Sequence, residues 1–223
     1  MSLKLMGKKR GMTQIFDDKG NITVCTVIEA QPNVVTQVKT KESDGYDAIQ
    51  LGFETINVKD PRTIARRSSK ALRGHFQKAG VAPRRYIGES TVENASSYAL
   101  GQEISIAAFA DVPFVDACGM SKGKGYQGVM KKFHYAGGPA SHGSGFHRHA
   151  GSTGMRSTPG RCLPGGPRAS QMGHDKVTVQ NIRVVAVHPE ENVILLEGAV
   201  PGPRNGLIYL SPAVKKATAK KKK

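Results

Sequence analysis

The sequence predicts a mainly β protein, in which a β-barrel carries a basic helical insertion and a long Gly-rich extended loop. Runs of alternating apolar and polar residues, separated by turn residues, occur near both ends of the 223-residue chain. Such alternation is typical of half-buried strands. Residues 119–174, here called the Gly-rich stretch, lie between these runs. They contain 14 of the 26 glycines and no acidic residue. The simplest arrangement joins the strands on either side in one closed or nearly closed barrel and inserts the basic segments in loops.

Turn residues between apolar runs predict the first strands. Residues 12–16 and 22–28 flank turn-forming residues 17–20 and predict a hairpin. Residues 33–40 predict a third strand, and residues 42–45 predict a turn into a fourth strand at 46–53. In that fourth strand Ile49, Leu51 and Phe53 share one face, because side chains alternate along a strand.

A basic insertion, residues 59–85, follows these strands and carries a net charge of +8. Apolar or small residues recur there every four positions within 61–79 and predict one helix. A surface helix with a solvated basic face explains this pattern as well as a nucleic-acid contact does. The lack of acidic partners at helical spacing favours contact with RNA. The repeating positions are Ile64, Ser68, Leu72 and Phe76, and the basic positions are Arg66, Arg67, Lys70 and Arg73.

Strand patterns resume after the insertion and again after the Gly-rich stretch. Residues 86–92 and 103–109 predict strands, residues 127–134 predict a short helix, and residues 176–187, 193–197 and 207–210 predict the last strands. The predicted organisation is therefore a barrel body of residues 1–118 and 175–212, an extension of residues 119–174, and a flexible Lys-rich tail of residues 213–223.

The net charge of +16 predicts a polyanionic partner. The Gly-rich stretch contributes +8, the insertion +8 and the segment 215–223 contributes +6, so the remaining chain carries −6. The basicity thus belongs to three appendages of a mildly acidic body, which is typical of a globular protein with RNA-binding extensions.

The Gly-rich stretch has two interpretations. It could be a flexible linker, since Gly-rich segments are flexible by default. Aromatic residues such as Tyr126, Phe133 and Tyr135, together with the exclusion of acidic residues, favour a segment that enters a polyanion. Glycine allows backbone N–H groups to approach phosphates, and Lys and Arg neutralise them with release of counterions.

Several enzymatic or cofactor-binding interpretations of the same stretch find little support. Residues 123–128 match GxGxxG, but a dinucleotide site also needs a βαβ unit and an acidic residue about 20 positions later, and the first acid is Asp175. No GxxxxGK[ST] is present. The spacing of His142, His147 and His149 fits no paired zinc motif, and the stretch lacks second-shell carboxylates. A metal-free ribonuclease built on these histidines stays open, as does a free RNA chaperone.

The remaining composition predicts a reduced, cytoplasmic protein. The three cysteines are far apart and form no CxxC motif. No apolar run has membrane length, and the N-terminal residues have no signal-peptide apolar region. We expect no membrane partner, no metal, no cofactor and no small-molecule substrate.

Short sequence blocks are spread over nearly the whole chain. They are GKKRGMT at 7–13, GMSKGKG at 119–125, HGS at 142–144, PG at 159–160, QMG at 171–173, VTVQN at 177–181 and GAVPG at 198–202. In these blocks and in their order, the chain resembles the bacterial type of the large-subunit ribosomal protein L-three family.

This resemblance implies a translation-factor-type β-barrel on the outside of the large ribosomal subunit and a loop that extends into the ribosomal RNA. It implies binding near the 3′ end of the large-subunit rRNA early in assembly, no catalysis by the protein itself, and ribosomal proteins L-fourteen and L-nineteen as neighbours. It also implies a loop tip close to the peptidyl transferase centre. The tip residues would be Gly151, Ser152, Thr153, Gly154, Met155, Arg156, Ser157, Thr158, Pro159 and Gly160.

From the charge pattern and the resemblance together we expect rRNA to contact three groups of residues. Near the N-terminus and in the insertion they are Lys8, Lys9, Arg10, Arg66, Arg67 and Arg73. At the base of the Gly-rich stretch they are Lys122, Lys124, Gly125, Lys131 and Lys132. Further along they are His142, Phe146, His147, Arg148, His149, Arg156, Arg161 and Arg168.

The tip departs from the family pattern at one position. Some bacterial members carry an N-methylated glutamine where this chain has Ser157. Serine cannot carry that modification, so we expect it to be absent.

Overall fold

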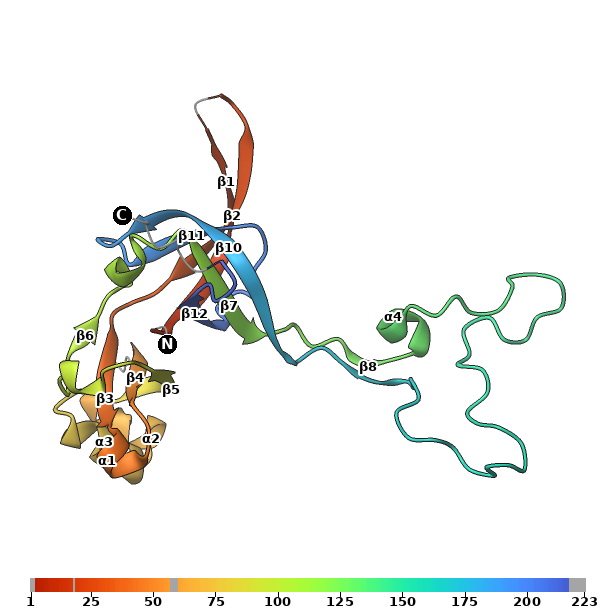
Figure 1. The fold of residues 1–223 in the computed structure, drawn as a ribbon, viewed down its shortest axis with the longest axis horizontal. Coiled ribbons are helices and arrows are strands. Elements are labelled where there is room, and N and C mark those ends of the chain that lie inside the picture. Colours follow the sequence, from red (N-terminus) through yellow and green to blue (C-terminus); the bar gives the residue numbers. More distant parts are fainter. Residues whose placement is uncertain (1–2, 18, 57–59, 217–223) are drawn as a thin grey trace. The chain divides into compact units, whose positions relative to one another are not determined.

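The computed structural model describes residues 3–17, 19–56 and 60–216, and this part of the chain is mainly β, as predicted (Figure 1). It divides into two compact units. Met1–Met120 and Lys176–Lys223 form the body, and Ser121–Asp175 form the second unit, here called the extension. The expected Lys-rich tail lies outside the described residues from position 217 onward, as does Lys59 of the insertion.

Within the described residues, six antiparallel strands of the body pair in a closed ring, each with two neighbours (Figure 1). The order around the ring is β1 (Leu5–Phe16), β12 (Leu207–Pro212), β7 (Phe114–Met120), β10 (Lys176–His188), β11 (Val193–Glu197) and β2 (Ile22–Glu29). Strands β2, β10, β11 and β12 lie close to their expected positions, whereas β1 begins at Leu5 and not at residue 12, and β7 was not predicted.

The other early strands form a sheet of their own, which corrects the expectation of a single barrel. Each strand in this sheet pairs antiparallel with its neighbours. The turn between β3 and β4 is a four-residue helix, α1 (Lys41–Asp44), that ends at Gly45 with φ 84°. This short connection favours the pairing of β3 with β4. The order in this sheet is β5 (Arg84–Thr91), β4 (Ala48–Thr55), β3 (Asn33–Lys39) and β6 (Glu103–Ile104).

One hydrophobic core joins the sheet to the barrel. Ile49, Leu51 and Phe53 of β4 are at most 1% exposed, which confirms their predicted common face, and they belong to the same buried cluster as Leu5 and Ile208 of the barrel. The two layers meet closely at Gly88, where an added Cβ would lie 3.0 Å from the Tyr209 ring and 3.1 Å from the Met6 sulfur.

The predicted single helix of the insertion is wrong, because the chain breaks at Ser68 and Ser69. A 3-10 turn (Pro61–Thr63) leads into α2 (Ile64–Arg67), and α3 (Lys70–Lys78) follows. The Ser68 hydroxyl donates to the Ile64 carbonyl at 2.9 Å, and the Ser69 hydroxyl caps α3 by accepting from the Leu72 N–H at 3.3 Å. Side chains that bond the local backbone compete with a continuous helix.

The strand expected at 103–109 is also shorter than predicted. Strand β6 ends at Ile104, and Ile106–Phe109 form a 3-10 turn whose end residues are buried. Another 3-10 turn, Ala95–Ser97, precedes it. Burial of Ile106 and Phe109 thus comes from a turn that packs on the core, and apolar residues three apart fit such a turn.

The extension has little regular structure. It contains strands β8 (Gly125–Gln127) and β9 (Ser170–Met172), which pair antiparallel, and helix α4 (Val129–Phe133), which lies where a short helix was expected. The β8–β9 ladder was not predicted. Across the described part of the chain, no helix has both the length and the apolar character to cross a membrane.

Candidate nucleic-acid interface

Backbone hydrogen bonds close the extension at its base, here called the neck (residues 121–127 and 170–175). The Ser121 N–H donates to the Asp175 carbonyl at 2.8 Å, and the Lys124 N–H donates to the Met172 carbonyl at 2.9 Å. Gly173 has φ 71°, and a Cβ there would lie 2.2 Å from the Lys122 carbonyl oxygen. Glycine is therefore required where the two chain segments meet.

Lys132 fastens α4 to the neck. Its ammonium donates to the Ser170 hydroxyl at 2.6 Å and to the Gln171 carbonyl at 2.8 Å, and it lies 5.2 Å from the centre of the Phe133 ring. Val129 of α4 is the one buried residue within 121–175, all of which are described. Polar contacts and close backbone approach hold this unit, which has almost no apolar core.

Residues 137–149 form a loop that closes on itself. The Gly138 N–H lies 3.2 Å from the Phe146 carbonyl and 3.3 Å from the His147 carbonyl. The His147 Nδ1 lies 3.0 Å from the Pro139 carbonyl, and the Phe146 and His149 rings meet edge to face at 5.7 Å. The predicted RNA contacts His147 and His149 thus help to shape the loop, while Phe146 stays 63% exposed and available for base stacking.

The expected tip, residues 151–160, is exposed at every position. Its local contacts are the Ser152 hydroxyl on the Gly154 carbonyl at 2.8 Å and the Gly160 N–H on the Arg156 carbonyl at 3.2 Å. Beside the tip, a hydrogen bond with Thr153 and the nearby Arg168 guanidinium lower the pKa of the exposed Cys162 thiol.

The extension's cations are mostly uncompensated. Asp175 is its one acidic residue, and the ion pairs found among the described residues all lie in the body. A cation without a carboxylate partner keeps its full attraction for phosphate. Within the extension, the exposed Lys and Arg side chains without a hydrogen-bond or ion-pair partner among the described residues are Lys122, Lys124, Lys131, Arg148, Arg156 and Arg161.

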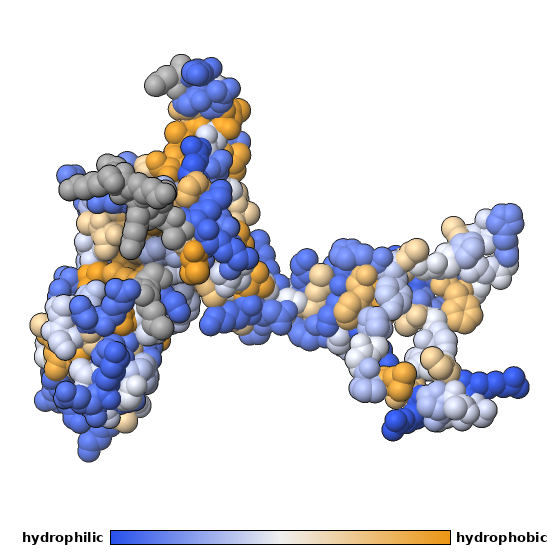
Figure 2. Space-filling view, viewed as in Figure 1, coloured by the Kyte–Doolittle hydropathy of each residue, from blue (hydrophilic) through white to orange (hydrophobic). Residues whose placement is uncertain are grey.

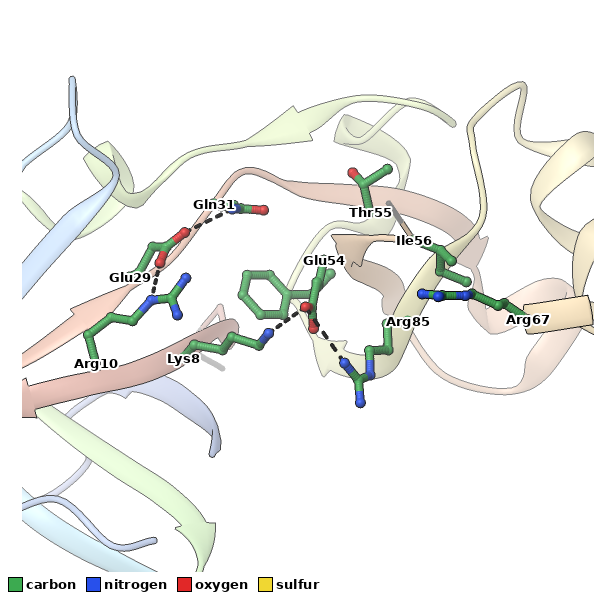
Figure 3. A pocket seen from close by; sticks show the side chains of 10 residues that line it. Lys8, Arg10, Glu29, Gln31, Glu54, Thr55, Ile56, Arg67 and Arg85 are labelled. Carbon is green, nitrogen blue, oxygen red and sulfur yellow. Dashed lines mark hydrogen bonds and ion pairs between the residues drawn. The ribbon is translucent and has the colours of Figure 1, made fainter. Parts of the chain in front are cut away.

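The predicted N-terminal cations have partners within the body, and Figure 3 shows those of Lys8 and Arg10. Lys8 pairs with Glu54, which also lies 3.9 Å from Arg85, and Arg10 pairs with Glu29. The hydrogen bond from Arg10 lowers the pKa of Glu29. The Lys9 ammonium donates to the Val200 carbonyl at 2.7 Å. Carboxylates thus balance the charges of Lys8 and Arg10, while the Lys9 ammonium bonds a backbone carbonyl.

The insertion's cations differ from one another. Arg66 and Arg67 are exposed, whereas Arg73 is half-buried, and its Nε is buried without a partner among the described residues. The remaining predicted residues, Gly125 and His142, lie at positive φ in the extension, at 69° and 60°. The predicted site residues thus belong to both units.

The dinucleotide-binding interpretation finds no geometric support in the extension. Gly123–Gly128 contains the three-residue strand β8 of an antiparallel ladder, so the parallel βαβ context of a dinucleotide site is missing there. No group of three or more His, Cys, Asp or Glu that could hold a metal occurs among the described residues.

Tyr126 was noted only as one of the aromatic residues of the Gly-rich stretch, and the structure makes it a further candidate for RNA contact. This side chain is 75% exposed on β8, two residues after Lys124. An exposed aromatic beside lysines can stack on a base. The sequence feature that could have indicated this role is an aromatic residue between glycines in a basic segment.

Comparison with known proteins gives consistent matches. Residues 35–192 match the family model described as Ribosomal protein L3. The large ribosomal subunit protein uL3 of Protochlamydia amoebophila (strain UWE25) is 62% identical over 222 residues, covering 100% of this chain and 94% of that protein. The protein of the same name from Chlamydia muridarum (strain MoPn / Nigg) is 53% identical over 210 residues, covering 93% of this chain and 95% of that protein.

Proposed function

The chain belongs to the ribosomal protein L3 family, and we propose that it is a structural constituent of the large ribosomal subunit, in the cytoplasm, that binds large-subunit rRNA directly. The observation that carries this proposal is the extension, in which exposed cations lack carboxylate partners and one side chain is buried. Beyond its neck, such a segment gains too little from its own core to be ordered alone, and a polyanion supplies the missing contacts.

Binding would combine charge and backbone exposure. The free Lys and Arg side chains of the extension neutralise phosphates and release counterions. Exposed Tyr126 and Phe146 offer faces for stacking on unpaired bases. The neck limits the conformations open to the loop, which lowers the entropy lost when RNA orders it.

The finer parts of the proposal rest on the resemblance to the family. The closed ring of strands would be a translation-factor-type barrel, and residues 151–160 would reach toward the peptidyl transferase centre. The protein would bind early, near the 3′ end of the rRNA, with L-fourteen and L-nineteen as neighbours, and would perform no catalysis and use no cofactor. Substitution of Arg156 would then change the reaction centre indirectly, by moving rRNA.

Ultraviolet crosslinking of purified large subunits, followed by mass spectrometry of the peptide–RNA products, tests the proposal. We expect crosslinked peptides of this chain to come mainly from residues 119–174, with Tyr126 and Phe146 among the crosslinked residues. Crosslinks confined to the body would contradict the role given to the extension. The same spectra test the Ser157 prediction, because a methylated glutamine in this loop would overturn it.

A further inference from the structure

The outer part of the β1–β2 hairpin carries an exposed apolar surface. Its members, here called the apolar hairpin face, are Met12, Phe16, Ile22 and Val24, with 52%, 65%, 57% and 42% exposure. Figure 2 shows hydrophobic colour along this hairpin below a hydrophilic turn. Single exposed apolar residues are ordinary, but a contiguous group on one element indicates an interaction site.

Strand register places these side chains on one face. Phe16 lies opposite Ile22, and Gln14 lies opposite Val24. Directly opposed residues of an antiparallel pair project to the same face, and so does every second residue along a strand, which adds Met12. Met12, Phe16 and Val24 also line one shallow hollow.

No further strand supports this part of the hairpin among the described residues. Strand β12 pairs with β1 only at 5–8, and β11 pairs with β2 only at 25–29. An isolated two-stranded ribbon with an exposed apolar face is marginally stable in water. A surface packed against this face would stabilise it.

The charge near the apolar hairpin face indicates which class of molecule packs against it. Residues 11–24 contain Asp17, Asp18 and Lys19 as their charged residues, a net charge of −1 in a chain of +16. Hydrogen bonds from the Asn21 side chain and backbone lower the pKa of Asp17, so its carboxylate is anionic at neutral pH. The carboxylate repels phosphate, and together with the apolar side chains beside it suits a basic protein.

We propose that the apolar hairpin face is a docking surface for a neighbouring basic protein of the large ribosomal subunit, which packs an apolar patch on Phe16 and Ile22 and places Lys or Arg near Asp17. This inference rests on the proposed function, because it requires the chain to be in the subunit. The extension and the hairpin then have separate tasks, one toward RNA and one toward protein.

Site-specific photocrosslinking in salt-washed large subunits tests the proposal. The photoreactive residue p-benzoylphenylalanine replaces Phe16, and a control chain carries it in place of Leu100, which is 56% exposed in the body outside the hairpin. We expect the Phe16 position to crosslink one basic ribosomal protein, and the Leu100 position to leave that protein unlabelled. Crosslinking to rRNA, to a second copy of this chain or to nothing overturns the proposal. Absence of the chain from the subunits would instead refute the proposed function.

A binding measurement supplies the second test. The partner is the ribosomal protein that photocrosslinking identifies, purified separately and without a crosslink. The double variant Phe16→Ser, Ile22→Ser is expected to bind this partner at least about tenfold more weakly than the unsubstituted chain does, because buried apolar anchors carry most interface energy. Leu100→Ser is the matched control and is expected to bind unchanged. Equal affinity of the double variant and the unsubstituted chain would overturn the inference.

Discussion

Gly173→Ala is expected to open the neck of the extension. The alanine Cβ would lie 2.2 Å from the Lys122 carbonyl oxygen, whereas ordinary contact begins at 3.4 Å. The backbone must therefore shift by roughly 1 Å, which the neighbouring hydrogen bond from the Lys124 N–H to the Met172 carbonyl does not tolerate. The positive φ adds strain of about 1 kcal/mol for a residue with a side chain.

The magnitude follows from these terms. Loss of the Lys124–Met172 and Ser121–Asp175 hydrogen bonds costs about 1 kcal/mol each, which with the strain gives about 3 kcal/mol. Since 1.4 kcal/mol is a factor of ten, the neck should open about 100-fold more often. Gly165→Ala is the matched control, because Gly165 also has positive φ, 81°, but an added Cβ meets nothing within 4 Å.

Millisecond hydrogen exchange of the Lys124 amide in the purified chain measures this opening. We expect fast exchange in the Gly173→Ala variant and near-normal exchange in the Gly165→Ala variant. Equal exchange in the two variants would refute the argument that close backbone approach at Gly173 holds the neck.

Four other predictions follow from charge and titration. R156A is expected to reduce the slope of log affinity for rRNA against log salt by about 1. K8A is expected to leave that slope unchanged and lower the free energy of unfolding by about 1–2 kcal/mol, as measured by denaturant titration, because Lys8 sits in a half-buried ion pair. The hydrogen-bonded ion pair with Lys39 lowers the pKa of Glu89 from its ordinary value of 4.5. The stabilising contribution of the Glu89 carboxylate is therefore present above pH 4.5 and is lost as the pH falls through the lowered pKa. E89Q should therefore flatten the acid side of the stability–pH curve, and parallel curves for the two chains would contradict this. Iodoacetamide should modify Cys162, which is exposed and has a lowered pKa, much faster than Cys25, which is buried and has a raised pKa. Equal modification rates, measured by mass spectrometry, would contradict the lowered pKa of Cys162 and the raised pKa of Cys25.

The fold was predictable where structure is set by local pattern. Alternation placed the β1–β2 hairpin and β10, and the common face of Ile49 and Phe53 followed from their spacing. The partners of β3, β4 and β5 were not predictable, because alternation shows that a strand has a buried face but does not identify the strand beside it. The helix break at Ser68 was missed for a related reason, since four-residue spacing continues through two serines that bond the backbone.

The candidate site was predictable in composition and only partly in geometry. Free cations such as Arg148 were evident from the absence of acidic residues nearby. The balance of Lys8 by Glu54, 46 positions away, could not be seen in sequence, because long-range ion pairs depend on the packing of two sheets. The neck depends on three-residue strands, which are too short for a periodic signal.

Sedimentation of cell lysate through a high-salt sucrose gradient tests the central claim most directly, with quantification of this chain in each fraction. Salt removes loosely held basic proteins, because affinity dominated by phosphate contacts falls steeply with ionic strength. If the chain is an integral rRNA-bound component, it will remain stoichiometric with the large subunit. If it runs free at the top of the gradient, the proposal of a structural constituent held by its extension is wrong.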